Sequence, residues 1–159
     1  MKKALIVLVM ICVLATTVMA LGTNIKPVCK LGTTLNLVEK NPSDWSVVSG
    51  GAKATIMDIC NPMVYLLKGY SLAPNTKYTL IYYGDATHND VWPYATCLGS
   101  GTSDFFGRVL FGGMPGFGKY FNDGVNQKIW LILSSDVDCA AGKMTKWNPT
   151  EYLFEYNTI

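Results

Sequence analysis

Several groups of residues have types and spacings that could support chemistry, beginning with a glycine-rich segment. Residues 113–119 read GMPGFGK and match the core of a phosphate-binding loop. Tyr120, however, stands where such a loop needs Ser or Thr to hold magnesium, and residues 121–124 (FNDG) do not begin the helix whose N-terminus stabilises phosphate. We therefore predict a glycine-rich surface loop that binds no nucleotide.

Two acidic stretches could hold a divalent cation or supply a hydrolytic site. Residues 85–90 (DATHND) contain the only histidine, and residues 134–138 (SSDVD) carry two carboxylates on one side of an extended segment. Neither matches the calcium-loop pattern, no G-x-S-x-G elbow is present, and Asp and Asn also make ordinary turns. Polar connections are the favoured interpretation. The alternative is a secreted hydrolase or calcium-assisted enzyme. It requires that side chains from this set meet in one cleft: Asp85, His88, Asp90, Asp136 and Asp138.

Aromatic residues in or beside predicted loops are a better lead to function. Loops usually carry the binding surface of a β domain, and exposed rings offer flat contact area for sugars or protein partners. The competing interpretation is that these rings fold back as lids over the core, where Trp130, within an apolar run, is expected. The candidate ligand contacts are Trp92, Tyr94, Phe105, Phe106, Phe117, Tyr120 and Phe121.

The elements that must position these residues begin after an export segment. Residues 1–20 combine Lys2 and Lys3, an apolar stretch, and small residues at positions minus three and minus one of a cut site after Ala20, as in a secretory signal peptide. An uncleaved membrane anchor is the alternative, although the stretch is barely long enough to span. Removal leaves residues 21–159 as one soluble domain without stable membrane insertion. Its acidic and basic side chains are then equal in number, which gives no electrostatic reason to bind nucleic acid.

Four cysteines remain in the exported domain, and an even number outside the cytosol indicates two disulfides. Spacing alone does not choose among the three pairings. We predict Cys97 with Cys139, because both lie at the ends of strand-like runs, which leaves Cys29 with Cys60. Free thiols are the alternative. The spacing matches no zinc site, and we expect no cofactor.

Short apolar runs separated by Gly, Pro, Asn and Asp predict an all-β domain. Seven or eight such strands indicate an immunoglobulin-like antiparallel β-sandwich after the N-terminal signal helix. The predicted strands cover residues 33–38, 52–60, 64–72, 77–83, 95–102, 108–111, 128–134 and 150–156.

The stretch LAPNTKYTL, residues 72–80, resembles the tyrosine corner of fibronectin type III and related immunoglobulin-like sandwiches. The resemblance implies that Tyr78 turns its hydroxyl back to the backbone upstream, beyond Pro74, with Leu72 packed beneath it. A plain hairpin with Tyr78 merely packed is the alternative.

A broader resemblance covers most of the chain after the signal. The segments TLNLVEKNPSDW, YTLIYYGD, LGSGTSD, KIWLILSSDVDC and WNPTEYLFEY are similar to a family of small exported archaeal and bacterial domains. That family implies a secreted β domain and no particular activity. The chain departs from its pattern around residues 60–64 and 113–124. The function expected from the sequence is a secreted or cell-surface module, non-catalytic, that binds a cell-envelope polymer or a protein partner.

Overall fold

A computed structural model of the chain describes residues 34–57, 64–83, 93–113 and 128–156, and these residues form an all-β domain. Each strand of the main sheet overlaps one of the eight predicted runs. They are β1 (Thr34–Glu39), β2 (Lys53–Met57), β3 (Tyr65–Tyr70), β4 (Lys77–Tyr83), β5 (Thr96–Thr102), β6 (Val109–Gly113), β7 (Lys128–Leu133) and β10 (Leu153–Glu155).

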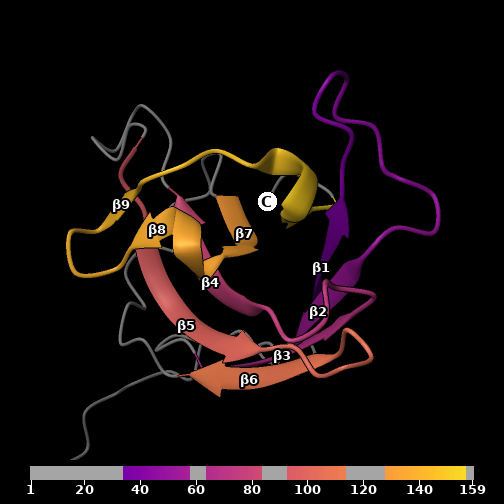
Figure 1. Cartoon of the computed structure of the whole chain (residues 1–159), viewed down its shortest axis with the longest axis horizontal. Helices are drawn as coiled ribbons and strands as arrows, with labels where there is room; N and C mark the ends of the chain where they lie inside the picture. Colours follow the sequence, from indigo (N-terminus) through magenta and orange to yellow (C-terminus); the bar gives the residue numbers. More distant parts are fainter. Residues whose placement is uncertain (1–33, 58–63, 84–92, 114–127, 157–159) are drawn as a thin grey trace, which may run out of the picture.

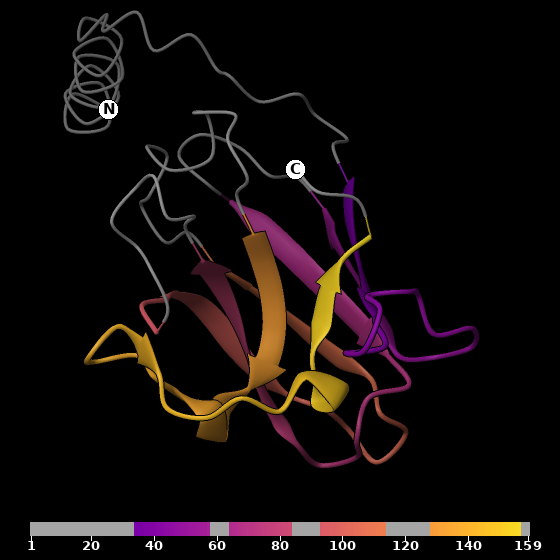
Figure 2. The same ribbon diagram turned by 90° about the horizontal axis from the view of Figure 1, so that it is seen from above.

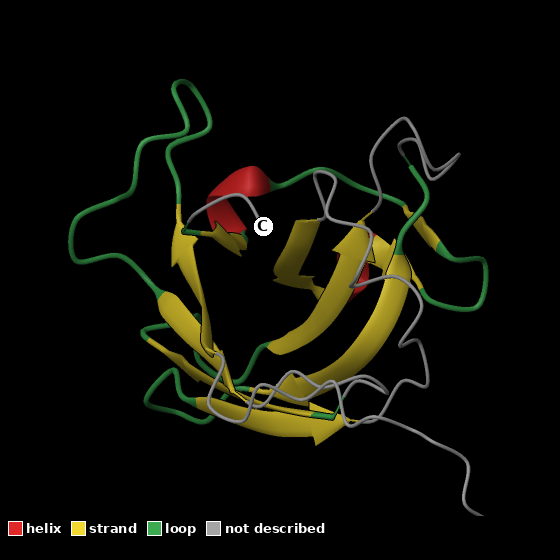
Figure 3. Cartoon of the chain, turned by 180° about the vertical axis from the view of Figure 1, so that it is seen from behind, coloured by secondary structure: helices red, strands yellow, loops and turns green. Residues whose placement is uncertain are grey.

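All eight strands belong to one antiparallel sheet, in the order β5-β4-β7-β10-β1-β2-β3-β6. The first and last strands, β5 and β6, lie side by side, so the sheet curves round until it nearly closes (Figures 1 and 3). The prediction of an all-β domain is confirmed, but the two facing sheets of an immunoglobulin-like sandwich are replaced by this barrel-like arrangement. The alternating pattern shows only that one face of each strand is buried. It does not distinguish a second sheet from the far side of the same sheet.

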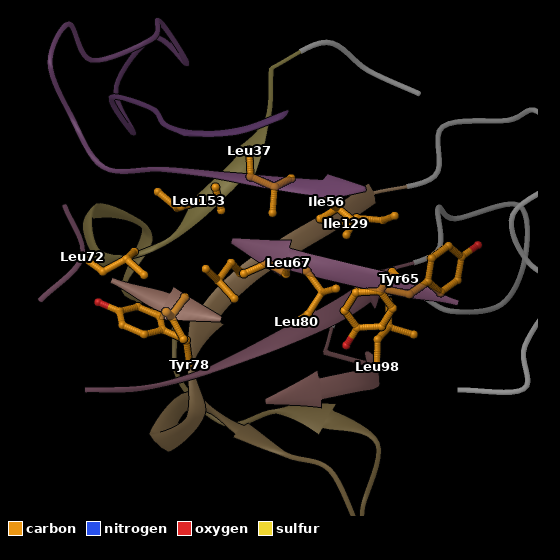
Figure 4. Packing of buried hydrophobic residues seen from close by; sticks show 14 residues of the cluster. Leu37, Ile56, Tyr65, Leu67, Leu72, Tyr78, Leu80, Leu98, Ile129 and Leu153 are labelled. Carbon is orange, nitrogen blue, oxygen red and sulfur yellow. The ribbon is translucent and has the colours of Figure 1, made fainter. Parts of the chain in front are cut away.

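The interior of the curved sheet is filled by side chains from every strand (Figure 4). Alternate residues point inward, as the period of a strand requires. Leu37, Ile56, Leu67, Leu80 and Ile129 are fully buried there. Each such burial stabilises the fold by about 1.5–3 kcal/mol.

A second apolar cluster lies on the outer face of β4, β7 and β10. The segment between β7 and β10 returns along this side of the sheet (Figure 2). Its residues Val137, Met144 and Tyr152 belong to the same cluster as Ile81, Trp130, Ile132 and Phe154. It contains η2 (Ser134–Asp136), the hairpin of β8 (Val137–Asp138) and β9 (Lys143–Met144), and η3 (Pro149–Glu151). Burial on both faces explains why β7 reads as a nearly continuous apolar run.

Side chains rather than hydrogen bonds fill the seam between β5 and β6. Among the described residues, no ladder joins these two strands. A Cβ at Gly101 would lie 2.6 Å from the ring of Phe111, and one at Gly99 would meet the hydroxyl of Tyr65. The glycines of β5 therefore make room for the two rings that close the barrel.

Tyr78, the second residue of β4, closes one end of the interior core beside Leu72, while Tyr65 and Leu98 lie at the other end (Figure 4). The N–H of Ala73 donates a hydrogen bond to Tyr78 Oη at 3.1 Å. Burial raises the pKa of Tyr78 despite this bond. The hydroxyl thus turns back five residues along the chain past Pro74, here at the rim of a barrel-like sheet. No helix in the described ranges has the length and hydropathy needed to cross a membrane.

Candidate functional site

The structure describes three of the seven aromatic residues predicted as ligand contacts. Tyr94, Phe105 and Phe106 are all exposed, the two phenylalanines by 73% and 71%. They are therefore not lids over the core. The other four, which are Trp92, Phe117, Tyr120 and Phe121, lie outside the described residues.

The aromatic turn, residues 103–108, connects β5 to β6 and holds Phe105 and Phe106 away from the core. Asp104 organises it: Oδ1 accepts the N–H groups of Phe106 and Arg108 at 2.8 and 2.9 Å, and Oδ2 accepts Arg108 Nε at 2.8 Å. The hydrogen bond from the Arg108 side chain is the main reason that the pKa of Asp104 is lowered. Gly107 has φ +70° and packs against the carbonyl of Leu72. The two phenylalanines are consequently presented by a turn with a defined shape.

The predicted disulfide between Cys97 and Cys139 is confirmed, with 5.6 Å between the Cα atoms. It ties β5 to the turn of the β8–β9 hairpin, beside a hollow of about 280 Å³ that Tyr94 also lines. The bond indicates an oxidising, extracytoplasmic setting. Cys29 and Cys60 lie outside the described residues.

The two described acids of the alternative enzyme hypothesis have separate local roles. Asp136 is 1% exposed and accepts hydrogen bonds from Tyr152 Oη (2.7 Å), Asn148 Nδ2 (2.8 Å) and Ser135 Oγ (2.8 Å). Asp138 caps its own turn by accepting the N–H groups of residues 140 and 141. The described ranges contain no cluster of three metal-ligating side chains. Asp85, His88 and Asp90 lie outside them.

A different site, which we call the tryptophan hollow, lies on the outer face of the sheet beside β10. Its volume is about 180 Å³. Its walls come from the neighbouring strands β7 and β10 and from the connection between β1 and β2, which is distant from both in the sequence. The lining residues are Lys40, Trp45, Lys128, Trp130, Phe154 and Glu155.

Trp45 is positioned by a hydrogen-bonded turn within the connection between β1 and β2. Its backbone has φ +60°, a left-handed conformation that is rare for a bulky residue. The N–H of Trp45 donates to the carbonyl of Asn41 at 2.8 Å, and Asp44 Oδ1 accepts the N–H and hydroxyl of Ser46. These bonds hold the indole edge-on to Phe154, at 5.1 Å between ring centroids, with 49% of the residue exposed. Such strain persists only where surrounding structure fixes it, and it often marks functional sites.

Phe154 is the common neighbour of an aromatic group that continues beyond the hollow. Its ring lies 5.3 Å from that of buried Trp130 and 6.3 Å from that of half-exposed Trp147. Three of the four tryptophans of the chain thus surround one phenylalanine. Lys128 and Trp130 are two residues apart on β7, which places them on the same face of the sheet.

Glu155 brings a buried carboxylate to the hollow. It is 6% exposed, and its Oε1 accepts the N–H of Ile129 where β7 and β10 have stopped pairing. Burial raises the pKa of Glu155. Hydrogen bonds from backbone N–H groups and the Trp130 side chain, together with the charge of Lys40, oppose this rise. The carboxylate therefore has local partners for its charge.

The sequence reasoning missed Trp45 and Trp147 as surface aromatics. Both stand next to turn-forming residues, NPSD before Trp45 and NP after Trp147, and this position was the available signal. Trp130 was assigned to the core and is buried, but on the outer face rather than inside the barrel.

Comparison of the chain with protein-family models, curated proteins and solved structures finds no match. The resemblance to a family of small exported domains therefore has no counterpart in these comparisons, and the candidate function depends on the site itself.

Proposed function

We propose that the protein is an extracytoplasmic, non-catalytic binding module that holds a saccharide unit of a cell-envelope polymer in the tryptophan hollow. The observation that carries this proposal is the half-exposed indole of Trp45, fixed at the rim in a left-handed backbone conformation. Export is supported by the signal-like N-terminus and by the Cys97–Cys139 bond.

The chemistry of the lining suits a sugar. Aromatic rings provide a flat apolar surface for the C–H face of a pyranose, and the nearby Lys and Glu side chains provide donors and an acceptor for its hydroxyl groups. The hollow, at about 180 Å³, is smaller than the roughly 300–1,000 Å³ typical of small-molecule pockets. One ring of a longer polymer therefore fits this site better than a large compact ligand.

The test is a titration of the full chain with solubilised cell-envelope polysaccharides, monitored by tryptophan fluorescence. We expect a saturable change in emission that Trp45→Ala abolishes while the far-ultraviolet circular dichroism stays unchanged. The matched control is Phe105→Ala, which removes an exposed aromatic residue far along the chain, in the aromatic turn, and should bind like wild type. Loss of binding in the control, or none with Trp45→Ala, would contradict the assignment of the site.

The aromatic turn favours a second candidate function, docking of a protein partner. Exposed apolar aromatics with an adjacent Arg are typical of interface hot spots, and Arg108 lies 5.0 Å over the ring of Phe106. In a pull-down from cell envelopes, a double Phe105→Ala, Phe106→Ala variant should lose a protein that wild type and Trp45→Ala both retain. Equal capture by wild type and by both variants would rule out this role.

A further inference from the structure

The outer face of β3 and β6, which we call the β3–β6 face, lies across the barrel from the second apolar cluster. In the order of the nearly closed sheet, β3 and β6 stand opposite β7 and β10, which carry that cluster on their outer side (Figure 1). Because alternate residues of a strand point to opposite faces, β3 presents Leu66, Lys68 and Tyr70 outward, and β6 presents Leu110. All four residues are exposed.

This face is continuous with the aromatic turn. Leu72, two residues after β3, donates its N–H to the carbonyl of Gly107 at 3.0 Å, which fastens the turn to the end of β3. A hollow of about 380 Å³ joins the two, with Lys68, Tyr70, Asp104, Arg108 and Leu110 in its lining. Five of the eleven exposed large apolar residues in the described ranges therefore belong to one surface, namely Leu66, Tyr70, Phe105, Phe106 and Leu110.

The charged residues of this surface are positive apart from one acid that is already paired. Among the described residues of β2, β3, the aromatic turn and β6, Asp104 is the only acid, and Arg108 Nη2 lies 2.7 Å from its Oδ2. Lys68 stands opposite Leu110 in the sheet, and Lys53 of β2 stands opposite Tyr70. Both lysines are exposed, and no ion pair joins either of them to a described acid. The surface therefore offers apolar contact beside positive charge.

We propose that the β3–β6 face and the aromatic turn together dock an acidic segment of a partner protein, which places an apolar side chain in the hollow and a carboxylate at Lys68. This inference rests on the docking role proposed for the aromatic turn and names the chemistry of the partner. Carboxylates complement the two lysines, whereas a second copy of this chain would bring lysines against lysines. The hollow favours a protein over an anionic lipid surface, because a concave site fits a side chain of fixed position and a fluid bilayer presents none.

The test begins with random peptides displayed on phage, selected on the immobilised full chain and sequenced. We expect the recovered peptides to combine Leu, Phe or Trp with Asp or Glu, and selection on Lys68→Glu should lose this acidic preference. One recovered peptide is then synthesised with a fluorescent label, together with a version whose carboxylates are replaced by amides. In anisotropy titrations with the full chain, the acidic peptide should bind more tightly than its amide version by on the order of tenfold, and less tightly as salt rises.

Substitutions locate the bound peptide. Lys68→Gln and Leu110→Thr should each weaken binding of the acidic peptide several-fold, and Lys68→Gln should leave binding of the amide version unchanged. The matched controls are Lys143→Gln, an exposed lysine of β9, and Val47→Thr, an exposed apolar residue between β1 and β2, which should change neither affinity. Circular dichroism of each variant reports that the fold is retained.

The other occupants of this surface have outcomes of their own. Peptides without acidic enrichment, or an acidic peptide that is lost in the double Phe105→Ala, Phe106→Ala variant but retained by Lys68→Gln and Leu110→Thr, would overturn this inference and leave the docking role of the aromatic turn standing. Binding of the full chain to phosphatidylglycerol vesicles, or self-association in sedimentation, would assign the surface to lipid or to a second copy if Leu110→Thr abolishes it. Recovery of no peptide would overturn this inference, and equal capture in the envelope pull-down as well would overturn both proposals.

Discussion

Replacing Tyr152 by Phe tests how the segment that carries Trp147 is held against the sheet. Tyr152 is fully buried, and its hydroxyl donates to Asp136 at 2.7 Å while accepting the N–H of Asn148 at 3.0 Å. The Phe ring would keep the packing against Trp147 and Phe154. The substitution therefore removes one charge-assisted hydrogen bond and leaves a backbone N–H without this acceptor. A hydrogen bond to a charged group contributes about 1.5–3 kcal/mol, so we expect the free energy of unfolding to fall by about 2–3 kcal/mol at neutral pH.

The pH dependence of this stability difference tests the role of Asp136 more directly than its size at neutral pH. Burial raises the pKa of Asp136, but hydrogen bonds from Tyr152, Asn148 and Ser135 outweigh it, so the pKa lies below its usual value. A lowered carboxyl pKa contributes stability above the unfolded pKa of about 4, and this contribution is lost as pH falls through the folded pKa. Tyr152→Phe removes one source of the lowering. The difference between wild type and variant should therefore shrink as the solution is acidified.

The assay is urea unfolding followed by tryptophan fluorescence, at neutral pH and in steps down to about pH 2. The control, Tyr156→Phe, alters a residue that is 55% exposed and should change stability by less than about 0.5 kcal/mol at any pH. A cost for Tyr152→Phe that is constant or grows on acidification would refute the role given to Asp136.

Three further predictions follow from the described contacts. Replacing Cys97 and Cys139 by Ser opens a loop with a sequence separation of 42, which should lower the free energy of unfolding by about 4 kcal/mol in denaturant titrations. Gly101→Ala would place a methyl group 2.6 Å from the ring of Phe111 at the barrel seam, so we expect a loss of about 1–3 kcal/mol and a lower melting temperature; an unchanged melting temperature would show that the seam is loosely packed. Glu155→Gln should make the protein more stable than wild type at neutral pH. Because the pKa of Glu155 is raised in the folded state, its carboxyl group favours folding below the unfolded pKa, and this stability is lost as pH rises through the folded pKa. The neutral Gln side chain does not undergo this loss. The two proteins should converge near pH 4, and a less stable variant at neutral pH would contradict this sign.

Local sequence patterns were sufficient to predict the strands, one disulfide and one hydrogen bond from a tyrosine to the backbone. Alternating and continuous apolar runs located all eight strands of the main sheet, because side-chain period and turn residues are properties of a few neighbouring positions. The bond between Cys97 and Cys139 was predicted from their places at the ends of strand-like runs, although cysteine spacing alone leaves three pairings open. The spacing from Leu72 to Tyr78 marked the place where a tyrosine hydroxyl meets the backbone of Ala73.

Tertiary structure alone decided that the strands close into one sheet and where the tryptophan hollow lies. β10 pairs with both β1 and β7, and the pairing with β1 joins residues more than a hundred positions apart. No local pattern specifies such a distant partner. That pairing brings Lys40 and Trp45 beside Trp130 and Phe154. Read along the chain, the same four residues are a strand end, a turn and two core positions, because a surface site depends on which strands become neighbours after the chain folds.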